Sequence, residues 1–259
     1  MPLPAWRVAV TRDEGPDGPL TRALVREDLT PVRCPVLVEA PPADPAALTD
    51  VAARLADYDW IVCASARGVR ALLEARPAPH AGGELAWSAG LRTAAVGAAT
   101  AQALTEAGVG HPPVVGDGDG AEALWRTLAP LADWTAARVL VVTTPGGRSE
   151  LIDALRAAGA RVDAVEAYRM APRPAAAIAA DWTASAPDAA IIASPRTAEA
   201  LAAAVGAATL ARLAAVVAIG PTTARALDAL GVRAVTPPRA DFTLVARTLA
   251  DLRAAEATR

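Results

Sequence analysis

Short apolar runs alternate with helical stretches along most of the chain. The stretch around Leu48, Val51, Ala52 and Leu55 repeats at the spacing of one helix face. The apolar runs are continuous rather than alternating, as in parallel strands that are covered on both faces. Strands that alternate with helices predict right-handed βαβ units and an α/β sheet. The predicted strands are residues 8–10, 61–64, 94–96, 139–142, 190–193 and 216–219.

The chain contains an internal duplication. Residues 59–67 resemble residues 188–196, an offset of 129 positions from Ser65 to Ser194. Residues 95–104 resemble residues 218–227, and a glycine follows each helix at Gly108 and Gly231, where we expect a C′ glycine and then a strand. A period near 130 residues is too long for a solenoid repeat. The sequence therefore predicts two related doubly wound parallel-sheet domains.

Two proline-containing segments occupy equivalent places in the two copies. They are residues 33–42 and 165–172, and proline restricts both to an extended or edge conformation. If they pair, the chain crosses between the domains there, through a two-stranded linker, and leaves a cleft between the domains. The alternative is two sequential domains divided near residue 135. The predicted division is residues 1–33 plus 172–259 for the first, discontinuous domain, 39–165 for the second, and 34–38 with 166–171 for the ladder.

Composition narrows the class of protein. A hydrophobic content of 53% with 20% charged residues excludes a disordered chain. Two cysteines are too few for a disulfide scaffold or a cysteine-built zinc site. The chain has no apolar run of about 18 residues and no secretory pattern at its N-terminus, so we expect a cytoplasmic protein that does not enter a membrane.

The charged residues exclude several chemistries. All 25 basic residues are arginine, which rules out a lysine Schiff base and a P-loop lysine. The net charge of −3 argues against a dedicated nucleic-acid binder. The sequence shows no metal-ligand spacing, no Ser-His-Asp pattern and no dinucleotide loop, so we expect neither a metal nor a cofactor. The segment 116–120 is interpreted as a turn before a helix, His80 and His111 as loop residues, Cys63 as core, and Cys34 as an unactivated thiol.

Small, hydroxyl and arginine residues follow the predicted strands, where open α/β sheets bind their ligands. Each serine or threonine there could simply cap a helix. Together, however, helix N-termini and arginines favour anions, and two copies would present two rows of donors to a large polyanion. The candidate binding residues are Thr11, Arg12, Ser65, Arg67, Gly97, Thr100, Arg148, Ser194, Arg196, Thr222 and Thr223.

Tyr168 is the candidate catalytic residue. It lies in the proposed linker beside Arg169, in a chain with only two tyrosines. Its phenol could donate a hydrogen bond or a proton to a ligand. The alternative is an ordinary half-buried strand tyrosine.

These motifs resemble the uroporphyrinogen-III synthase family. The resemblance is carried by residues 218–227, 95–101, 61–69 and 166–169, and with the duplication it extends from Val8 to about Phe242. It implies two α/β domains joined by a two-stranded ladder, with the N-terminal segment in the same domain as the C-terminal half. It also implies cyclisation of hydroxymethylbilane to uroporphyrinogen III, with loss of water and inversion of the last pyrrole ring, by a monomer without metal or organic cofactor.

The resemblance also implies roles for single residues. Tyr168 matches the family tyrosine proposed to assist the leaving hydroxyl, and Thr100, Ser194 and Thr223 match cleft positions. Ala215 stands where some relatives carry a basic residue, which puts a cation at that point in doubt. The alternative to the enzyme is a noncatalytic two-lobed protein that binds a polyanionic metabolite or has a regulatory role.

Overall fold

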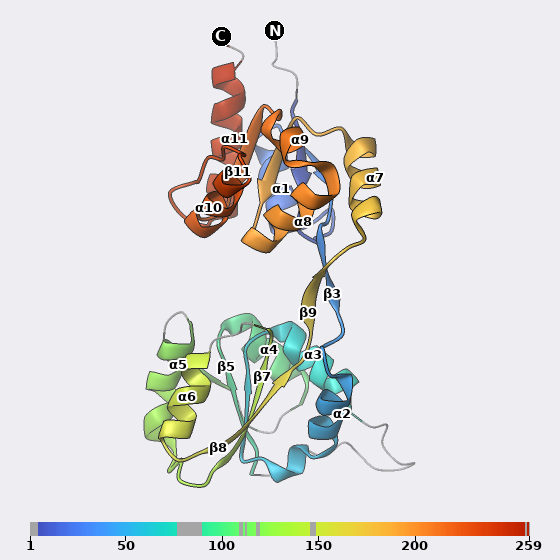
Figure 1. Ribbon diagram of the computed structural model, residues 1–259. Helices are drawn as coiled ribbons and strands as arrows, with labels where there is room; N and C mark the ends of the chain where they lie inside the picture. The colour runs from blue at the N-terminus through green and yellow to red at the C-terminus, as the bar shows by residue number, and fades with distance from the viewer. Residues whose placement is uncertain are drawn as a thin grey trace. The chain divides into compact units, whose positions relative to one another are not determined.

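The computed structural model describes residues 5–76, 90–108, 111, 113–117, 120–145, 149–256 and 258. The chain forms two compact units (Figure 1). Unit 1 consists of Met1–Val38 and Met170–Arg259, and unit 2 is Glu39–Arg169. His80 and Arg148 lie outside the described residues. None of the described helices combines the length and the apolar character needed to cross a membrane.

Unit 1 is built on a four-stranded parallel sheet. The strands lie in the order β11 (Ala215–Ala218), β10 (Ala189–Ile192), β1 (Arg7–Val10) and β2 (Thr30–Arg33). Val8 is paired with Ala189 and Ala190 with Val216, so the first strand of the chain lies beside a strand from its C-terminal third.

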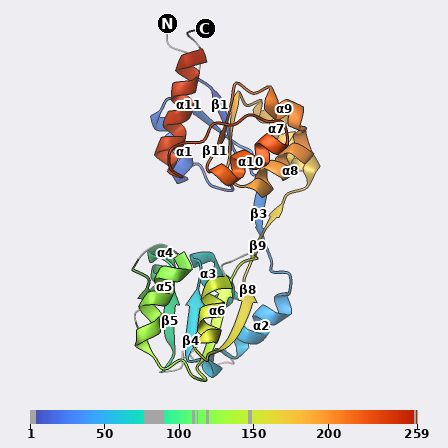
Figure 2. The ribbon, with the colours of Figure 1, turned by 60° about the vertical axis from the view of Figure 1, so that its left-hand side comes forward.

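Both faces of the unit 1 sheet are covered by helices, which explains why its strands are apolar at consecutive positions (Figure 2). Val8, Val10 and Ile191 pack on one face, and Ala9 and Ala190 pack on the other. The first face is covered by α1 (Pro19–Arg26) and α11 (Phe242–Glu256), and the second by α7 (Ala175–Ser185), α8 (Pro195–Val205), α9 (Ala207–Ala211) and α10 (Pro221–Ala229).

Unit 2 is built on a five-stranded parallel sheet. The strands lie in the order β6 (Val114–Val115), β5 (Arg92–Ala95), β4 (Trp60–Cys63), β7 (Arg138–Thr143) and β8 (Arg161–Glu166). Val62 pairs with Ala94 on one side and with Val141 on the other, which places β4 in the middle of the sheet.

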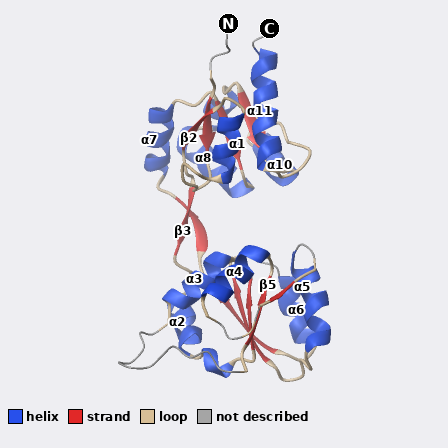
Figure 3. Ribbon diagram, turned by 180° about the vertical axis from the view of Figure 1, so that it is seen from behind, coloured by secondary structure: helices blue, strands red, loops and turns tan. Residues whose placement is uncertain are grey.

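Helices also cover both faces of the unit 2 sheet, so each unit is doubly wound (Figure 3). Ile61 and Cys63 face one side, while Trp60 and Val62 face the other, where the ring of Trp60 lies 5.1 Å from that of Trp134. The first side packs on α2 (Pro45–Ala53), the short 3₁₀ turn η1 (Leu55–Asp57), α3 (Ala66–Glu74) and α4 (Ala98–Glu106). The second side packs on α5 (Gly120–Leu128) and α6 (Ser149–Ala157). A second 3₁₀ turn, η2 (Ala129–Leu131), follows α5 directly.

The duplication is visible in backbone contacts as well as in strand order. The carboxylate of Asp59 accepts the N–H of Arg138 at 2.8 Å, and that of Asp188 accepts the N–H of Arg7 at 2.8 Å. In both copies an aspartate before one strand therefore satisfies the first donor of its parallel neighbour. The core order β5-β4-β7-β8 corresponds to β11-β10-β1-β2.

Between the units the chain runs through the paired strands β3 (Leu37–Ala40) and β9 (Arg169–Pro172). They form a two-stranded sheet separate from the other two sheets. The predicted pairing of the two proline-containing segments is therefore present.

The predicted elements form with small shifts at their ends. Five of the six predicted strands are present within one residue at each end, whereas the strand predicted at 94–96 begins two residues earlier, at Arg92. Helix α5 follows the segment 116–120 as expected. Gly108 and Gly231 have φ of 74° and 73°, the left-handed conformation of a C′ glycine. The prediction of a strand after Gly231 is wrong, because only an isolated bridge from Val235 to Val217 forms there.

Candidate functional site

Two helices of the duplicated pattern begin at a serine cap. In unit 2 the hydroxyl oxygen of Ser65 accepts the N–H of Gly68 at 3.0 Å, and in unit 1 that of Ser194 accepts the N–H of Thr197 at 3.2 Å. Both serines therefore cap a helix, as the sequence analysis allowed. A serine cap satisfies only one of the donors of a first helical turn, so the remaining N–H groups stay available to an anion.

The other two helices of the pattern begin at a glycine. Gly97 precedes α4 and Gly220 precedes α10, and neither helix has a side-chain cap. A Cβ placed at either glycine would have no heavy atom within 4 Å. The space in front of these two N-termini is therefore open, and their donors have no competing side chain.

One threonine in the first turn of each of these two helices is buried. Thr100 and Thr223 are 5% and 3% exposed, whereas Thr222 is exposed. Thr11 is also buried, and its hydroxyl donates to the carbonyl oxygen of Ile191 at 2.6 Å, which joins the end of β1 to β10. The hydroxyl of Thr11 thus serves the fold, and its contact with a ligand stays a prediction.

Arg12 lies directly after β1 and is held from two sides. Its guanidinium lies 4.8 Å from the centre of the Phe242 ring, and its Nε lies 3.7 Å from Oε2 of Glu14. Its side chain is 42% exposed. Neither Phe242 nor Glu14 was predicted as a site residue, because nothing in the sequence pattern indicates that either contacts Arg12.

Tyr168 lies between β8 and β9 and meets Ser65, which is 103 positions away in sequence. The phenol oxygen lies 3.3 Å from the hydroxyl oxygen of Ser65, and either can donate. Tyr168 is half-buried and borders a cavity of about 330 Å³ together with Leu48 and Ala71. The structure therefore brings the candidate catalytic residue and one candidate binding residue together within unit 2.

Arg67, in the first turn of α3, is paired with a carboxylate that the sequence did not indicate. Its Nε lies 3.5 Å from Oε2 of Glu39 on β3, and Nη2 of Arg70 lies 3.4 Å from the same oxygen. All three side chains are more than a third exposed, so these ion pairs are weak and a ligand carboxylate can compete with Glu39.

The second tyrosine has a structural role. Tyr58 is buried, and its hydroxyl donates to Oδ2 of Asp163 at 2.6 Å. Burial, followed by the hydrogen bond and the charge of Asp163, raises the pKa of Tyr58 to about 12. Burial also raises the pKa of Cys63 to about 12, and it is the main cause of the raised pKa of Cys34. Neither thiol is therefore activated, and Cys63 is a core residue as expected.

The candidate residues fall into two groups, one in each unit. In unit 1 they follow the neighbouring strands β1, β10 and β11, and in unit 2 they follow β4, β5 and β8. The described residues contain no group of three or more side chains suited to hold a metal ion. The unit 1 group is Thr11, Arg12, Ser194, Arg196, Thr222 and Thr223, and the unit 2 group is Ser65, Arg67, Gly97, Thr100 and Tyr168.

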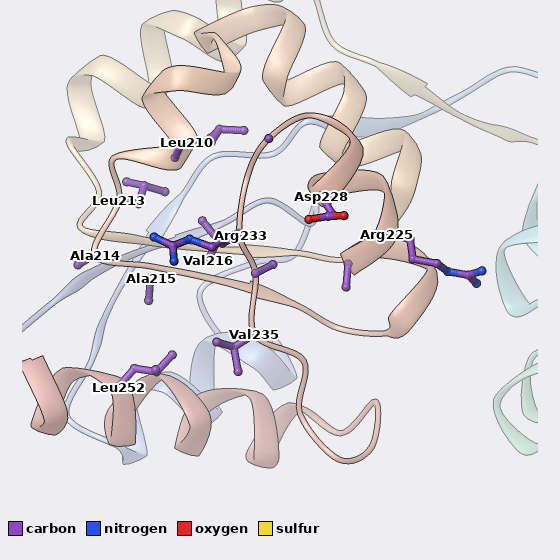
Figure 4. Close-up of a pocket in the computed structure, with 14 residues that line it drawn as sticks. Leu210, Leu213, Ala214, Ala215, Val216, Arg225, Asp228, Arg233, Val235 and Leu252 are labelled. Atoms are coloured by element: carbon purple, nitrogen blue, oxygen red, sulfur yellow. The ribbon is translucent and has the colours of Figure 1, made fainter.

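A larger cavity in unit 1 is not part of these groups. It has a volume of about 810 Å³ and lies beside the beginning of β11, at Ala214 and Ala215. Arg225 and Arg233 also line it, but they point in opposite directions (Figure 4). The cavity therefore lacks convergent cationic groups, and it contains none of the candidate residues.

The fold and the two groups of candidate residues define an α/β protein with two related units, each with helix N-termini at the ends of its parallel strands. The family model of uroporphyrinogen-III synthase HemD matches residues 18–244. The chain belongs to the uroporphyrinogen-III synthase family.

Individual relatives agree with this assignment. The chain is 31% identical over 170 residues to a uroporphyrinogen-III synthase of Synechococcus elongatus, a match that covers 65% of this chain and 62% of the relative. The matched region thus spans less than two thirds of that relative's length.

Two solved structures are similar over nearly the whole chain. A mutant uroporphyrinogen III synthase of Thermus thermophilus is 25% identical, with a TM-score of 0.55 and coverage of 95% of this chain and 98% of that one. A uroporphyrinogen-III synthetase of Helicobacter pylori is 16% identical, with a TM-score of 0.56 and coverage of 98% and 100%. The second likeness shows the fold alone.

Proposed function

We propose that this protein converts hydroxymethylbilane to uroporphyrinogen III, with loss of water and inversion of the last pyrrole ring. The observation that carries the proposal is the family match over residues 18–244. The named relatives and the donors at the strand ends of both units support it.

The substrate has the charge that these donors suit. It is a linear tetrapyrrole in which each ring bears an acetate and a propionate, so it is a polyanion. Helix N-termini and arginines stabilise carboxylates through N–H donors and positive charge. We therefore propose that Arg12, Arg196 and the N-termini of α8 and α10 bind one part of the substrate, and that Arg67 and the N-termini of α3 and α4 bind another. Arg148 is kept as a further proposed anion ligand, and Thr11 as a proposed contact.

Tyr168 is the proposed proton donor for the first step. The phenol O–H gives its proton to the departing hydroxyl, so that water leaves and an azafulvene cation remains on the substrate. The ring nitrogen of the pyrrole supplies the electron pair that expels the leaving group. A hydrogen bond between Ser65 and Tyr168 can hold the phenol in a fixed direction, since their oxygens are 3.3 Å apart.

The remaining steps need positioning rather than further acid–base groups. The substituted carbon of the last ring attacks the azafulvene and forms a spiro intermediate, which fragments and recloses with that ring inverted. On closure the last ring loses a proton. This proton returns to the phenolate of Tyr168 and replaces the one that left with the water. Anchored carboxylates can favour this path over direct closure, because they fix which carbon of the last ring meets the cation.

This route requires neither a metal nor an organic cofactor. We propose accordingly that the protein acts as a cytoplasmic monomer on a small molecule, without nucleic acid or membrane. Its predicted domains, 1–33 plus 172–259 and 39–165, are kept as a proposal. Limited proteolysis tests this division, because cleavage both between residues 34 and 38 and between residues 166 and 171 should release residues 39–165 intact.

The test of the proposed activity is incubation of the purified protein with fresh hydroxymethylbilane, oxidation of the products and separation of the isomers. We expect isomer III to dominate. Isomer I alone, at the spontaneous rate, would contradict the proposal and favour a protein that binds the polyanion without converting it.

A further inference from the structure

At the end of β1 in unit 1, the side chain of Arg12 contacts Glu14 and Phe242. We propose that Glu14 and Phe242 are positioning residues that hold the Arg12 guanidinium in the direction needed to bind a carboxylate of the substrate. The inference rests on the proposed function, because it assigns to Arg12 a side-chain carboxylate of the tetrapyrrole.

Glu14 is itself fixed by the beginning of α1. Its Oε1 accepts the backbone N–H of Thr21 at 2.7 Å and the hydroxyl of Thr21 at 2.9 Å. Gly18, the N-cap residue of α1, offers no side-chain cap, so Glu14 takes this role from outside the helix. A Cβ at Gly18 would lie 2.5 Å from the carboxyl carbon of Glu14, so a larger residue there would displace this carboxylate from its present position.

The second oxygen of Glu14 is directed toward Arg12. Oε2 is buried and has no hydrogen-bond partner, and the nearest cation to it is Nε of Arg12 at 3.7 Å. The Glu14 side chain is only 7% exposed, whereas that of Arg12 is 42% exposed. A buried carboxylate with one unbonded oxygen attracts a neighbouring cation more strongly than a solvated one does. Glu14 therefore draws the Nε edge of the guanidinium toward α1.

Phe242 restricts the position of the Arg12 guanidinium by contact with its ring. It is the only phenylalanine in the chain, it begins α11, and it packs partly buried against the core of unit 1. The guanidinium carbon of Arg12 lies 4.8 Å from the ring centre, within the range of a cation–π contact. The ring and the carboxylate together restrict the rotation of the arginine side chain.

The outer edge of the guanidinium remains available. Within the described residues, no hydrogen bond or ion pair involves Nη1 or Nη2 of Arg12. An arginine held at its Nε edge presents a two-pronged donor that matches a carboxylate. Because this orientation is set before binding, less conformational entropy is lost when a ligand binds.

The test uses variants that change the contacts of Arg12 but preserve the packing around it. Glu14→Gln keeps an oxygen that can accept both hydrogen bonds from Thr21 but removes the negative charge beside Arg12. Phe242→Leu keeps an apolar side chain but removes the ring, and Phe242→Tyr keeps the ring and serves as the rescue variant. Arg12→Met removes the positive charge itself.

We expect Glu14→Gln and Phe242→Leu each to raise KM for hydroxymethylbilane about threefold, with kcat little changed, because only pre-orientation is lost. Phe242→Tyr should keep the original KM. In an Arg12→Met background, neither substitution should raise KM further. An unchanged KM, or the same increase in the Arg12→Met background, would overturn the inference.

A second measurement does not depend on the activity. The Nε–H of a held arginine exchanges slowly with water and gives a sharp ¹H–¹⁵N signal. We expect such a signal for Arg12, assigned by its loss in Arg12→Met, and we expect it to broaden in Glu14→Gln and Phe242→Leu. If the protein yields no isomer III but this signal behaves as expected, the proposed function fails and the positioning of Arg12 stands. If isomer III forms but the Arg12 signal is the same in the unmodified protein, in Glu14→Gln and in Phe242→Leu, the positioning of Arg12 is refuted and the proposed function stands.

Discussion

Units 1 and 2 share a scaffold but differ in the side chains that they add to it. In both, an aspartate joins two parallel strands and a serine caps the helix that follows, as Asp188 and Ser194 do in unit 1 and Asp59 and Ser65 do in unit 2. Only in unit 2 does a tyrosine meet the capping serine, through Tyr168.

Unit 1 differs from unit 2 in the way its arginine at the end of β1 is supported. Arg12 is held by Glu14 and Phe242, whereas Arg67 in unit 2 is paired with the exposed Glu39. The duplication thus supplied helix N-termini that can bind anions to both units. The proposed acid, Tyr168, lies in unit 2, and the arginine proposed to be oriented by its neighbours, Arg12, lies in unit 1.

The shared scaffold predicts equal losses of stability at equivalent core positions. Leu72 and Leu201 are 2% and 0% exposed and occupy the same place in the two copies. Replacing either by alanine should lower the free energy of unfolding by about 3 kcal/mol, since each substitution leaves a cavity in a packed core. Urea unfolding followed by circular dichroism measures both. A loss below about 1 kcal/mol in one copy alone would show that the copies are not packed alike.

The difference in side-chain chemistry predicts unequal effects of the two tyrosines on activity. Tyr168→Phe should lower turnover about tenfold to a hundredfold without abolishing it, because a positioned acid is lost while the substrate keeps its own carboxyl groups and an electron-rich pyrrole. Tyr58→Phe, the matched control, removes a partly buried hydrogen bond to Asp163 and should affect stability more than turnover.

Steady-state rates and thermal melts of both tyrosine variants test whether Tyr168 acts on turnover and Tyr58 on stability. Unchanged turnover with unchanged folding in Tyr168→Phe would reduce Tyr168 to a structural residue. The proton donor would then have to be Thr223, a backbone N–H or the substrate itself.

The two serine caps sharpen the comparison further. Ser65→Ala and Ser194→Ala should each cost about 1 kcal/mol of stability, because each removes the cap of one helix. Only Ser65→Ala should also lower kcat, by severalfold, since it removes the partner of Tyr168. Unfolding curves and kcat values are compared for the pair, and equal kcat values would mean that Ser65 does not orient the phenol.

Alkaline pH should act on unit 2 through Cys63. Its pKa is raised to about 12 by burial, so the folded state holds the proton more tightly than the unfolded chain does. The stabilising contribution is complete below the pKa of an unfolded thiol and is lost as the pH rises toward 12, by about 1.5–2 kcal/mol at pH 10. In unit 1 the equivalent position is Ile192, which does not titrate.

Urea unfolding between pH 8 and pH 10 measures this loss. The Cys63→Ala variant should be less stable at pH 8 but should lose less stability between these pH values. If the two proteins lost stability in parallel, the buried thiol would not be the cause. Tyr58, with its pKa also raised to about 12, adds a further loss above pH 10.

The sequence was informative about the sheets because their strands are apolar at every position. Residues such as Ile61 and Val62 pack on opposite faces, so a run of both signals a strand covered on both sides. The single bridge at Val235, where a strand was expected, shows the limit of this pattern. A glycine and a valine predict where the chain turns, but they do not determine how many residues pair afterwards.

The site was less predictable from the sequence because its contacts join distant residues. A serine after a strand indicates a cap, but the meeting of Ser65 with Tyr168 depends on the fold of unit 2. Likewise, Glu14 is an ordinary loop residue until the start of α1 buries its carboxylate beside Arg12. The sequence therefore identified types of donor at strand ends, whereas the structure was needed to find their partners.

The most direct test of the central claim is the ratio of isomer III to isomer I formed from hydroxymethylbilane by the purified protein in the presence of a metal chelator. The account predicts that isomer III predominates, that the chelator has no effect, and that Tyr168→Phe slows its formation. A product consisting of isomer I alone, at the rate seen without protein, would contradict the account.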